Sequence, residues 1–221
     1  MNVPFSPFYF VLFLFILSFL MGAFYYGLVS LSVEKLGLTP GFAFMLLFGS
    51  LIGSGINIPL FTIRASEAGP FPEQRYYGLL RPPRQEFTGQ TLIAINLGGA
   101  VIPILFSLYL LNISGLSLPE AMIAISLVTV VCYFMSRPIM GLGIGMPILI
   151  APLTAAVVSL IINMEQSPPL AYVSGTLGVL IGADLLRLKD IRKLATPFAS
   201  IGGAGSFDGI FLTGLIAVLL T

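Results

Sequence analysis

The chain has 221 residues, of which 57% are hydrophobic and only 9% charged, and its mean hydropathy is +1.04. Soluble domains carry roughly 25% charged residues, so this composition excludes an ordinary soluble fold and predicts one membrane domain over residues 1–221. With no histidine, one cysteine and a net charge of +1, the chain cannot form an intrachain disulfide, a Cys/His zinc site or a Ser–His catalytic pair, and nothing indicates nucleic-acid binding.

Seven apolar stretches follow one another along the chain, each close to the 20 residues that a helix needs to cross a bilayer. The sequence therefore predicts an all-α, polytopic protein of the cell (inner) membrane, in contact with membrane lipids. No metal site and no cofactor are expected. The predicted spans are 8–30, 41–63, 90–111, 119–136, 141–163, 170–187 and 202–220.

Basic residues indicate the orientation of these spans. When the loops are assigned alternately to the two sides, nine of the ten Lys and Arg residues lie on one side and only Lys35 lies on the other. An excess of Lys and Arg marks the cytoplasmic side, so the N-terminus is predicted inside and the C-terminus outside. The longest loop, 64–89, is then cytoplasmic, and it is either a solvated connector or a lid that guides a substrate.

Two acidic residues lie inside predicted spans, namely Asp184 in GTLGVLIGADLLRL and Asp208 in IGGAGSFDGIFLTG. A carboxylate inside a span costs about 2.5–3.5 kcal/mol on insertion scales, and such residues are usually functional. Because spans 170–187 and 202–220 are antiparallel, both carboxylates fall in the cytoplasmic half. The structural alternative for Asp184 is that it reaches the interface or pairs with Arg187 at i+3.

Other polar or helix-breaking residues occur at the same predicted depth. Asn57 lies near the cytoplasmic end of span 41–63, and Asn96 lies one to two turns inside span 90–111. The segment GLGIGMP, which contains Gly145 and Pro147, weakens the helix at a similar level. Broken helices in membranes survive only where they face protein or a wet cavity, so these residues predict one polar site with the two aspartates.

Small residues recur at helical spacing in two spans. Gly49 and Gly53 precede Asn57 at intervals of four, and Ser174 precedes Gly178 and Gly182 in the same way. Small residues at this spacing usually allow helices to pack closely. We expect packing to be the role of most of the 24 glycines.

Two resemblances follow from these segments. Through GTLGVLIGADLL and GGAGSFDGIFLTG, the whole chain resembles the domain-of-unknown-function 1614 family of prokaryotic membrane proteins, a resemblance that implies no activity. Spans 170–187 and 202–220 also resemble the presenilin and signal peptide peptidase group of aspartyl intramembrane proteases. That group has one Asp near the cytoplasmic end of a span and a second in a G-x-G-D motif on the next. Here Ser206 and Phe207 separate Gly205 from Asp208.

The second resemblance implies a protease in which Asp184 and Asp208 are the catalytic pair and the substrate is a transmembrane helix. Gly203 and Gly205, with Asn57, Asn96, Gly145 and Pro147, are then candidates for substrate binding. A cation- or proton-coupled transporter or channel is the alternative, since paired Asp and Asn oxygens beside broken helices also suit an ion path. A third candidate is an accessory membrane subunit whose aspartates bind a basic residue of a partner.

The charge distribution makes a topology prediction. A reporter fused before Met1 is expected in the cytoplasm and one fused after Thr221 outside, because nine of ten basic residues then lie inside. Protease protection of the two reporters in inside-out vesicles measures this. Finding both ends on one side would remove one span from the scheme, and with it the common depth of the polar residues.

Overall fold

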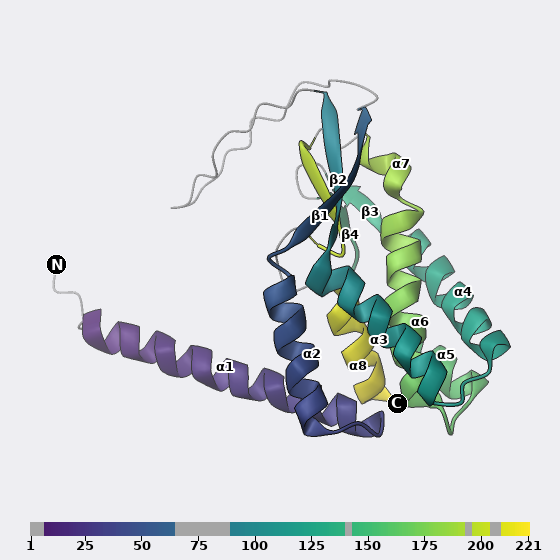
Figure 1. Ribbon diagram of the computed structural model, residues 1–221, viewed down its shortest axis with the longest axis horizontal. Coiled ribbons are helices and arrows are strands. Elements are labelled where there is room, and N and C mark those ends of the chain that lie inside the picture. The colour runs from purple at the N-terminus through teal and green to yellow at the C-terminus, as the bar shows by residue number, and fades with distance from the viewer. Residues whose placement is uncertain (1–6, 65–88, 140–142, 193–195, 204–208) are drawn as a thin grey trace.

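The computed structural model describes residues 7–64, 89–139, 143–192, 196–203 and 209–221, and most of these residues are helical (Figure 1). The α-helices are α1 (Pro7–Lys35), α2 (Pro40–Gly53), α3 (Ile102–Ile113), α4 (Leu118–Met135), α5 (Ile150–Ile162), α6 (Ser167–Val179), α7 (Leu188–Ile191) and α8 (Gly209–Leu220). Two π-helices, η1 (Leu97–Val101) and η2 (Leu180–Leu185), adjoin α3 and α6. The strands are β1 (Asn57–Arg64), β2 (Gln90–Asn96), β3 (Arg137–Ile139), β4 (Gly143–Gly145) and β5 (Phe198–Ile201).

Helix α6 is the centre of the bundle, and α3, α4, α5 and α8 pack around it (Figure 1). Small residues allow these helices to approach. A Cβ atom at Gly178 would lie 2.6 Å from Cγ1 of Val128 in α4, and one at Gly175 would lie 3.2 Å from Cβ of Ala155 in α5. On the α8 side, a Cβ atom at Gly214 would lie 2.5 Å from Oγ1 of Thr176. Close packing is therefore the role of these small residues, as the spacing of Gly178 predicts.

A three-stranded sheet caps one end of the bundle, in the order β1-β2-β5. Strand β1 pairs antiparallel with β2, and their register sets Asn57 opposite Asn96. Strand β5 pairs parallel with β2 on the other side. Near it, β3 and β4 form a separate antiparallel hairpin between α4 and α5. The strands therefore bring four distant parts of the chain to one end of the molecule.

The opposite end of the bundle holds the helix–helix turns and the C-terminus (Figure 1). Nζ of Lys35, the last residue of α1, donates hydrogen bonds to the carbonyl oxygens of Val218 (3.4 Å) and Leu219 (3.0 Å) at the end of α8. A cation at the C-terminus of a helix complements the helix dipole. Lys35 and the C-terminus thus lie at the end away from the sheets, as the predicted topology requires of residues on one side.

Several predicted helical spans are partly strand. Span 41–63 is helical only as far as Gly53 and continues as β1, and span 90–111 begins as β2 before it becomes helical. Pro59 explains the first change, because a proline removes a helix hydrogen bond and the residue before it avoids the α conformation. In span 141–163 the helix starts only at Ile150, after the glycines and proline of GLGIGMP. The mostly helical composition agrees with the all-α prediction, and the two sheets are additions to it.

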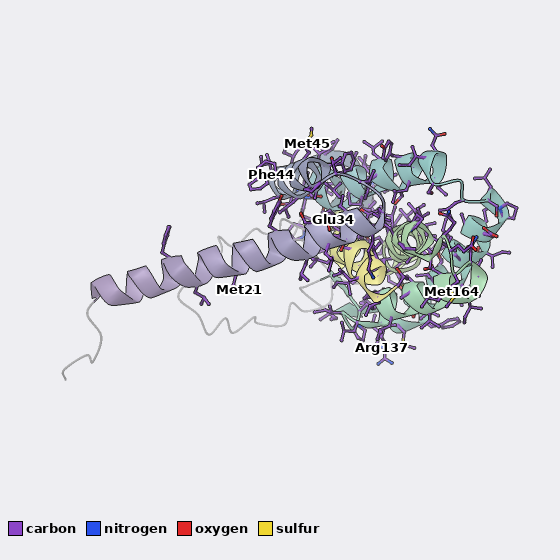
Figure 2. The ribbon with its side chains drawn as sticks, turned by 90° about the horizontal axis from the view of Figure 1, so that it is seen from below. Met21, Glu34, Phe44, Met45, Arg137 and Met164 are labelled. Carbon is purple, nitrogen blue, oxygen red and sulfur yellow. The ribbon has the colours of Figure 1, made fainter. Side chains whose placement is uncertain are left out.

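The described part of the chain has one helix, α4, that is long and apolar enough to cross a membrane. Helices α2, α5 and α8 are apolar but shorter, and the π-helix η1 with α3 makes a fourth such segment. Large apolar side chains are exposed in many elements. Figure 2 shows Met21 of α1, Phe44 and Met45 of α2, and Met164 of the turn between α5 and α6 pointing outward. Exposed apolar surface of this extent is typical of proteins that contact lipid or partners.

The packing of η2, which continues α6, against α4 predicts that Gly182→Ala destabilises the protein. A Cβ atom at Gly182 would lie 2.5 Å from the carbonyl oxygen of Thr129 and 2.9 Å from Cβ of Cys132 in α4. Overpacking of this kind costs about 1–3 kcal/mol, more than alanine gains in helix propensity. Thermal unfolding in detergent measures the effect. Gly27→Ala is the control, since nothing lies within 4 Å of that position; equal midpoints for the two variants would contradict the prediction.

Candidate functional site

Asn57 and Asn96 meet at the junction between the sheet and the helices. Nδ2 of Asn96 donates to Oδ1 of Asn57 at 3.1 Å and to the carbonyl oxygen of Ser54 at 2.7 Å. Oδ1 of Asn57 also accepts a hydrogen bond of 2.6 Å from the hydroxyl of Ser200 in β5. The two amides therefore join all three strands of the sheet to the end of α2.

Asn96 also begins the π-helix η1. Its Oδ1 accepts a hydrogen bond of 2.7 Å from the backbone N–H of Gly99, which satisfies one of the N–H groups left open at a helix start. The side chain is buried, and its hydrogen bonds use both the oxygen and the nitrogen of the amide. A buried amide without partners would cost free energy, so the contacts explain why this polar residue is tolerated here.

Asp184 lies in the second π-helix, η2, which follows α6. Its Oδ2 accepts a hydrogen bond of 3.0 Å from the backbone N–H of Gly202, the residue that follows β5. Gly202 has φ +80°, and a Cβ atom there would lie 2.5 Å from Cβ of Ala100 in η1. Gly202 thus fits between the two π-helices and turns its N–H toward the carboxylate. Single π-helical turns often occur at functional sites.

A cavity of about 440 Å³ lies between these elements. Four groups of residues line most of it: Phe198–Ile201 of β5, Gly143–Gly145 of β4, Ala183 with Asp184 of η2, and Ile210, Leu212, Thr213 and Ile216 of α8. Asp184 is the one ionisable residue among the described residues of the lining. Among the described residues, the wall is therefore mainly apolar, with Thr196, Ser200 and Thr213 as polar residues and Asp184 as the one carboxyl group. In the described chain no cluster of His, Cys, Asp or Glu could hold a metal ion.

Arg187 does not pair with Asp184, although the spacing of three residues allows it. Its Nη1 makes an ion pair of 3.0 Å with Oδ2 of Asp190, and its remaining donors reach the end of α4. Nη2 donates to the carbonyl oxygens of Tyr133 (2.6 Å) and Ser136 (2.9 Å), and Nε donates to the Ser136 hydroxyl (3.2 Å). The pairing of Asp184 with Arg187, one of the two structural alternatives for this aspartate, is therefore wrong.

The predicted site residues divide into three groups. Asp184, Gly145 and Gly203 line the cavity. Asn57 and Asn96 lie at the sheet junction and are not among the lining residues, and Pro147 falls between two lining residues, Met146 and Ile148, in the turn before α5. Gly205 and Asp208 lie outside the described residues, as does most of loop 64–89.

Sequence reasoning missed Ser200, which donates to Asn57. It picked out Gly202 as a place where two backbones could approach closely, but not as the partner of Asp184. Ser200 carried no signal, because a serine in an apolar segment has no distinctive pattern. Gly202 belongs to the pair Gly202–Gly203, and both have a positive φ. Two adjacent glycines indicate a turn, so this pair could have predicted the end of a strand at Ile201.

The contacts of Gly202 predict that Gly202→Ala unfolds at a lower temperature than the wild type. The substitution combines a positive φ, which an L side chain rarely adopts, with a clash against Ala100. Together these cost about 2–4 kcal/mol. Gly115→Ala is the matched control, since Gly115 has φ +67° with nothing within 4 Å and isolates the backbone cost. If both variants lose the same stability, the approach of Gly202 to η1 is not tight.

Comparison with known proteins returns one family. Residues 51–220 match the model described as "Protein of unknown function (DUF1614)", which covers the sheet, the cavity and every helix from α3 onward. No curated protein and no solved structure matches the chain, so the resemblance of spans 170–187 and 202–220 to the presenilin group gains no support from these comparisons. Because the family model covers more than half of the sequence, the chain belongs to the DUF1614 family.

Proposed function

We propose that the protein is an aspartyl protease of the membrane that hydrolyses a peptide bond in a transmembrane segment, with Asp184 and Asp208 as its catalytic pair. The observation that carries this proposal is the position of Asp184 in the wall of the cavity. Gly203 and Ile210, which flank the Asp208 segment in the sequence, line the same cavity. Residues on both sides of the Asp208 segment in the sequence thus line the cavity that Asp184 lines, and this supports the proposed pair.

The chemistry needs only these two carboxyl groups and water. Two carboxyl groups at close range share one proton, and the pair titrates as a unit. The ionised group takes a proton from a water molecule as its oxygen attacks the peptide carbonyl, and the protonated group donates its proton to the carbonyl oxygen. When the C–N bond breaks, the carboxyl group that took the water proton gives it to the leaving nitrogen. The other carboxylate takes a proton from a hydroxyl of the tetrahedral diol, so the acid and the amine form and the pair returns to its starting state.

A substrate backbone could enter the cavity in extended form. Strand β5 pairs with β2 on one side, and β4 pairs with β3 on one side. The residues of both strands line the cavity, whereas those of β3 do not. A peptide added to either of these strand edges would gain main-chain hydrogen bonds, a recurring mode of peptide recognition. Gly143, Gly145 and Gly203 leave room for a second backbone because they have no side chain.

The transporter is less well supported because Asn57 and Asn96 already have partners. In the transporter hypothesis, the amide oxygens of these two residues would be ligands of the transported ion. Oδ1 of Asn57 accepts from Asn96 and Ser200, and Oδ1 of Asn96 accepts from Gly99. Both residues therefore have a structural task, and the protease hypothesis needs no catalytic role for them.

Residues 1–221 are proposed to cross the membrane seven times, with the sheets at the cytoplasmic end. Arg64, Arg137 and Arg187 belong to or follow elements at the sheet end, whereas Lys35 lies at the other end. An excess of basic residues on the sheet side fits a cytoplasmic location. Helices of 12 to 14 residues, such as α2 and α8, reach only about 20 Å, and spans shorter than the hydrocarbon core are accommodated by local thinning of the bilayer.

Asparagine substitution of each aspartate tests the proposed pair. Asp184→Asn and Asp208→Asn are expected to lower cleavage of a reporter transmembrane helix by about 100-fold or more, as measured with the purified protein in lipid nanodiscs. The midpoint of thermal unfolding should stay the same or rise. In Asp184→Asn the new amide keeps an oxygen for the Gly202 N–H, and in both variants a carboxyl group is removed from a predicted membrane span.

Glu165→Gln is the matched control, since Glu165 is an exposed carboxylate in the turn between α5 and α6. It should cleave like the wild type. Full activity of Asp184→Asn would refute the catalytic pair. If the wild type cleaves no reporter but conducts protons or cations in liposomes, and the same substitutions abolish the current, the ion path is the function.

A further inference from the structure

Arg187 connects two walls of the cavity that are far apart in the sequence. It lies three residues after Asp184, just past η2, and its guanidinium reaches the last turn of α4 and the residue after it. Ser136, which it contacts through both the carbonyl oxygen and the hydroxyl, directly precedes β3. Arg187 itself is not among the residues that line the cavity.

The hairpin held in this way forms part of the cavity wall through β4, as β5 does elsewhere in the lining. Strand β3 pairs with β4, and Gly143–Gly145 of β4 line the cavity with Asp184. The chain leaves the end of α4 at Ser136, which is fully buried. The position of Ser136 relative to η2 therefore sets how far β4 stands from the carboxyl group of Asp184.

The contacts of Arg187 are stronger than a single ion pair would be. The guanidinium makes four hydrogen bonds, two of them to backbone carbonyls near the C-terminal end of α4, and its Cζ lies 4.2 Å from the centroid of the Tyr133 ring. Hydrogen bonds from a charged donor are roughly twice as strong as neutral ones, and a cation over an aromatic ring adds attraction. Lysine cannot reproduce this planar fork.

We propose that Arg187 is a positioning residue that fixes the separation between Asp184 and the β4 edge, and so the width of the substrate cleft. This inference rests on the proposed function for its kinetic consequence, but its geometric part does not depend on it. Loss of the guanidinium lets the β3–β4 hairpin move relative to η2. Substrate binding is then weakened more than the chemical step, because the carboxyl group of Asp184 keeps its hydrogen bond from Gly202.

A distance measurement tests the geometry without any substrate. Spin labels are attached to Arg137→Cys in β3 and Lys189→Cys in α7, two exposed positions on the two sides of Arg187, in a Cys132→Ala background. The full chain carrying Arg187→Gln is expected to give a broader and longer distance distribution than the same chain with Arg187. Arg187→Lys is expected to give a distribution intermediate between those of Arg187→Gln and the unchanged chain. Ser136→Ala removes one hydrogen bond and keeps the charge, so it should change the distribution least.

Arg192→Gln is the control, because it removes the same charge from an exposed position five residues further on. Its distribution should equal that of the unchanged chain. A distribution for Arg187→Gln and Arg187→Lys identical to that of the control would overturn the proposal. If Arg187→Gln does not fold, the graded series of Arg187→Lys and Ser136→Ala decides in the same way.

Kinetics separate this proposal from the function on which it rests. With the reporter helix, Arg187→Gln should raise KM about tenfold and change kcat by less than about threefold, and Arg187→Lys should restore part of KM. A fall in kcat with unchanged KM would contradict a role in cleft width. If the wild type does not cleave, the proposed function fails, and the distance distributions still decide whether Arg187 holds the hairpin.

Discussion

The arrangement of the molecule depends on how closely its helices approach α6. Eleven residues of this helix are buried, and small side chains face its neighbours on several sides. A Cβ atom at Gly178 or Gly214 would meet side-chain atoms at under 3 Å. These contacts fix the position of the C-terminal end of α6, from which η2 continues with Asp184. They also fix α8, which supplies another wall of the cavity. The geometry of the site therefore follows from packing in the bundle, which begins within about two helical turns of the carboxyl group.

Sequence reasoning located helices well where the apolar stretch was helical throughout. Span 119–136 corresponds to α4 within one residue, and the glycine spacing in span 170–187 predicted a packing face. It failed where an apolar stretch changes from helix to strand. Strand β1 continues directly from an apolar helix, and because both of its faces are apolar it lacks the alternation that reveals a half-buried strand. Hydropathy cannot distinguish an apolar helix from a strand that is apolar on both faces. Pro59 and the β-branched residues around it could have indicated the change from helix to strand.

The polar residues of the candidate site were recognised by type, but their partners were not. Both asparagines were expected beside Asp184, yet strand register sets them opposite each other, where they join the sheet. Arg187 is the nearest base to Asp184 in the sequence and instead binds the end of α4, more than 50 residues earlier. The partner of Asp184 is a backbone N–H from residue 202. Such long-range contacts depend on which strands pair, and no spacing within one helix reports that.

The sheets place a physical demand on the surroundings of the site. Strand edges carry backbone N–H and C=O groups that need partners, and open edges do not occur in contact with lipid. Among the described residues β4 pairs only with β3 and β5 only with β2, so the second edge of each strand needs water or another backbone beside it. In a membrane protein, water at this depth reaches only a cavity that opens to one side, and it must reach the carboxyl group for a peptide bond to be hydrolysed. Under the proposed function, the same strands would also bind an unwound substrate segment, so that water and substrate would meet in the cavity where Asp184 lies.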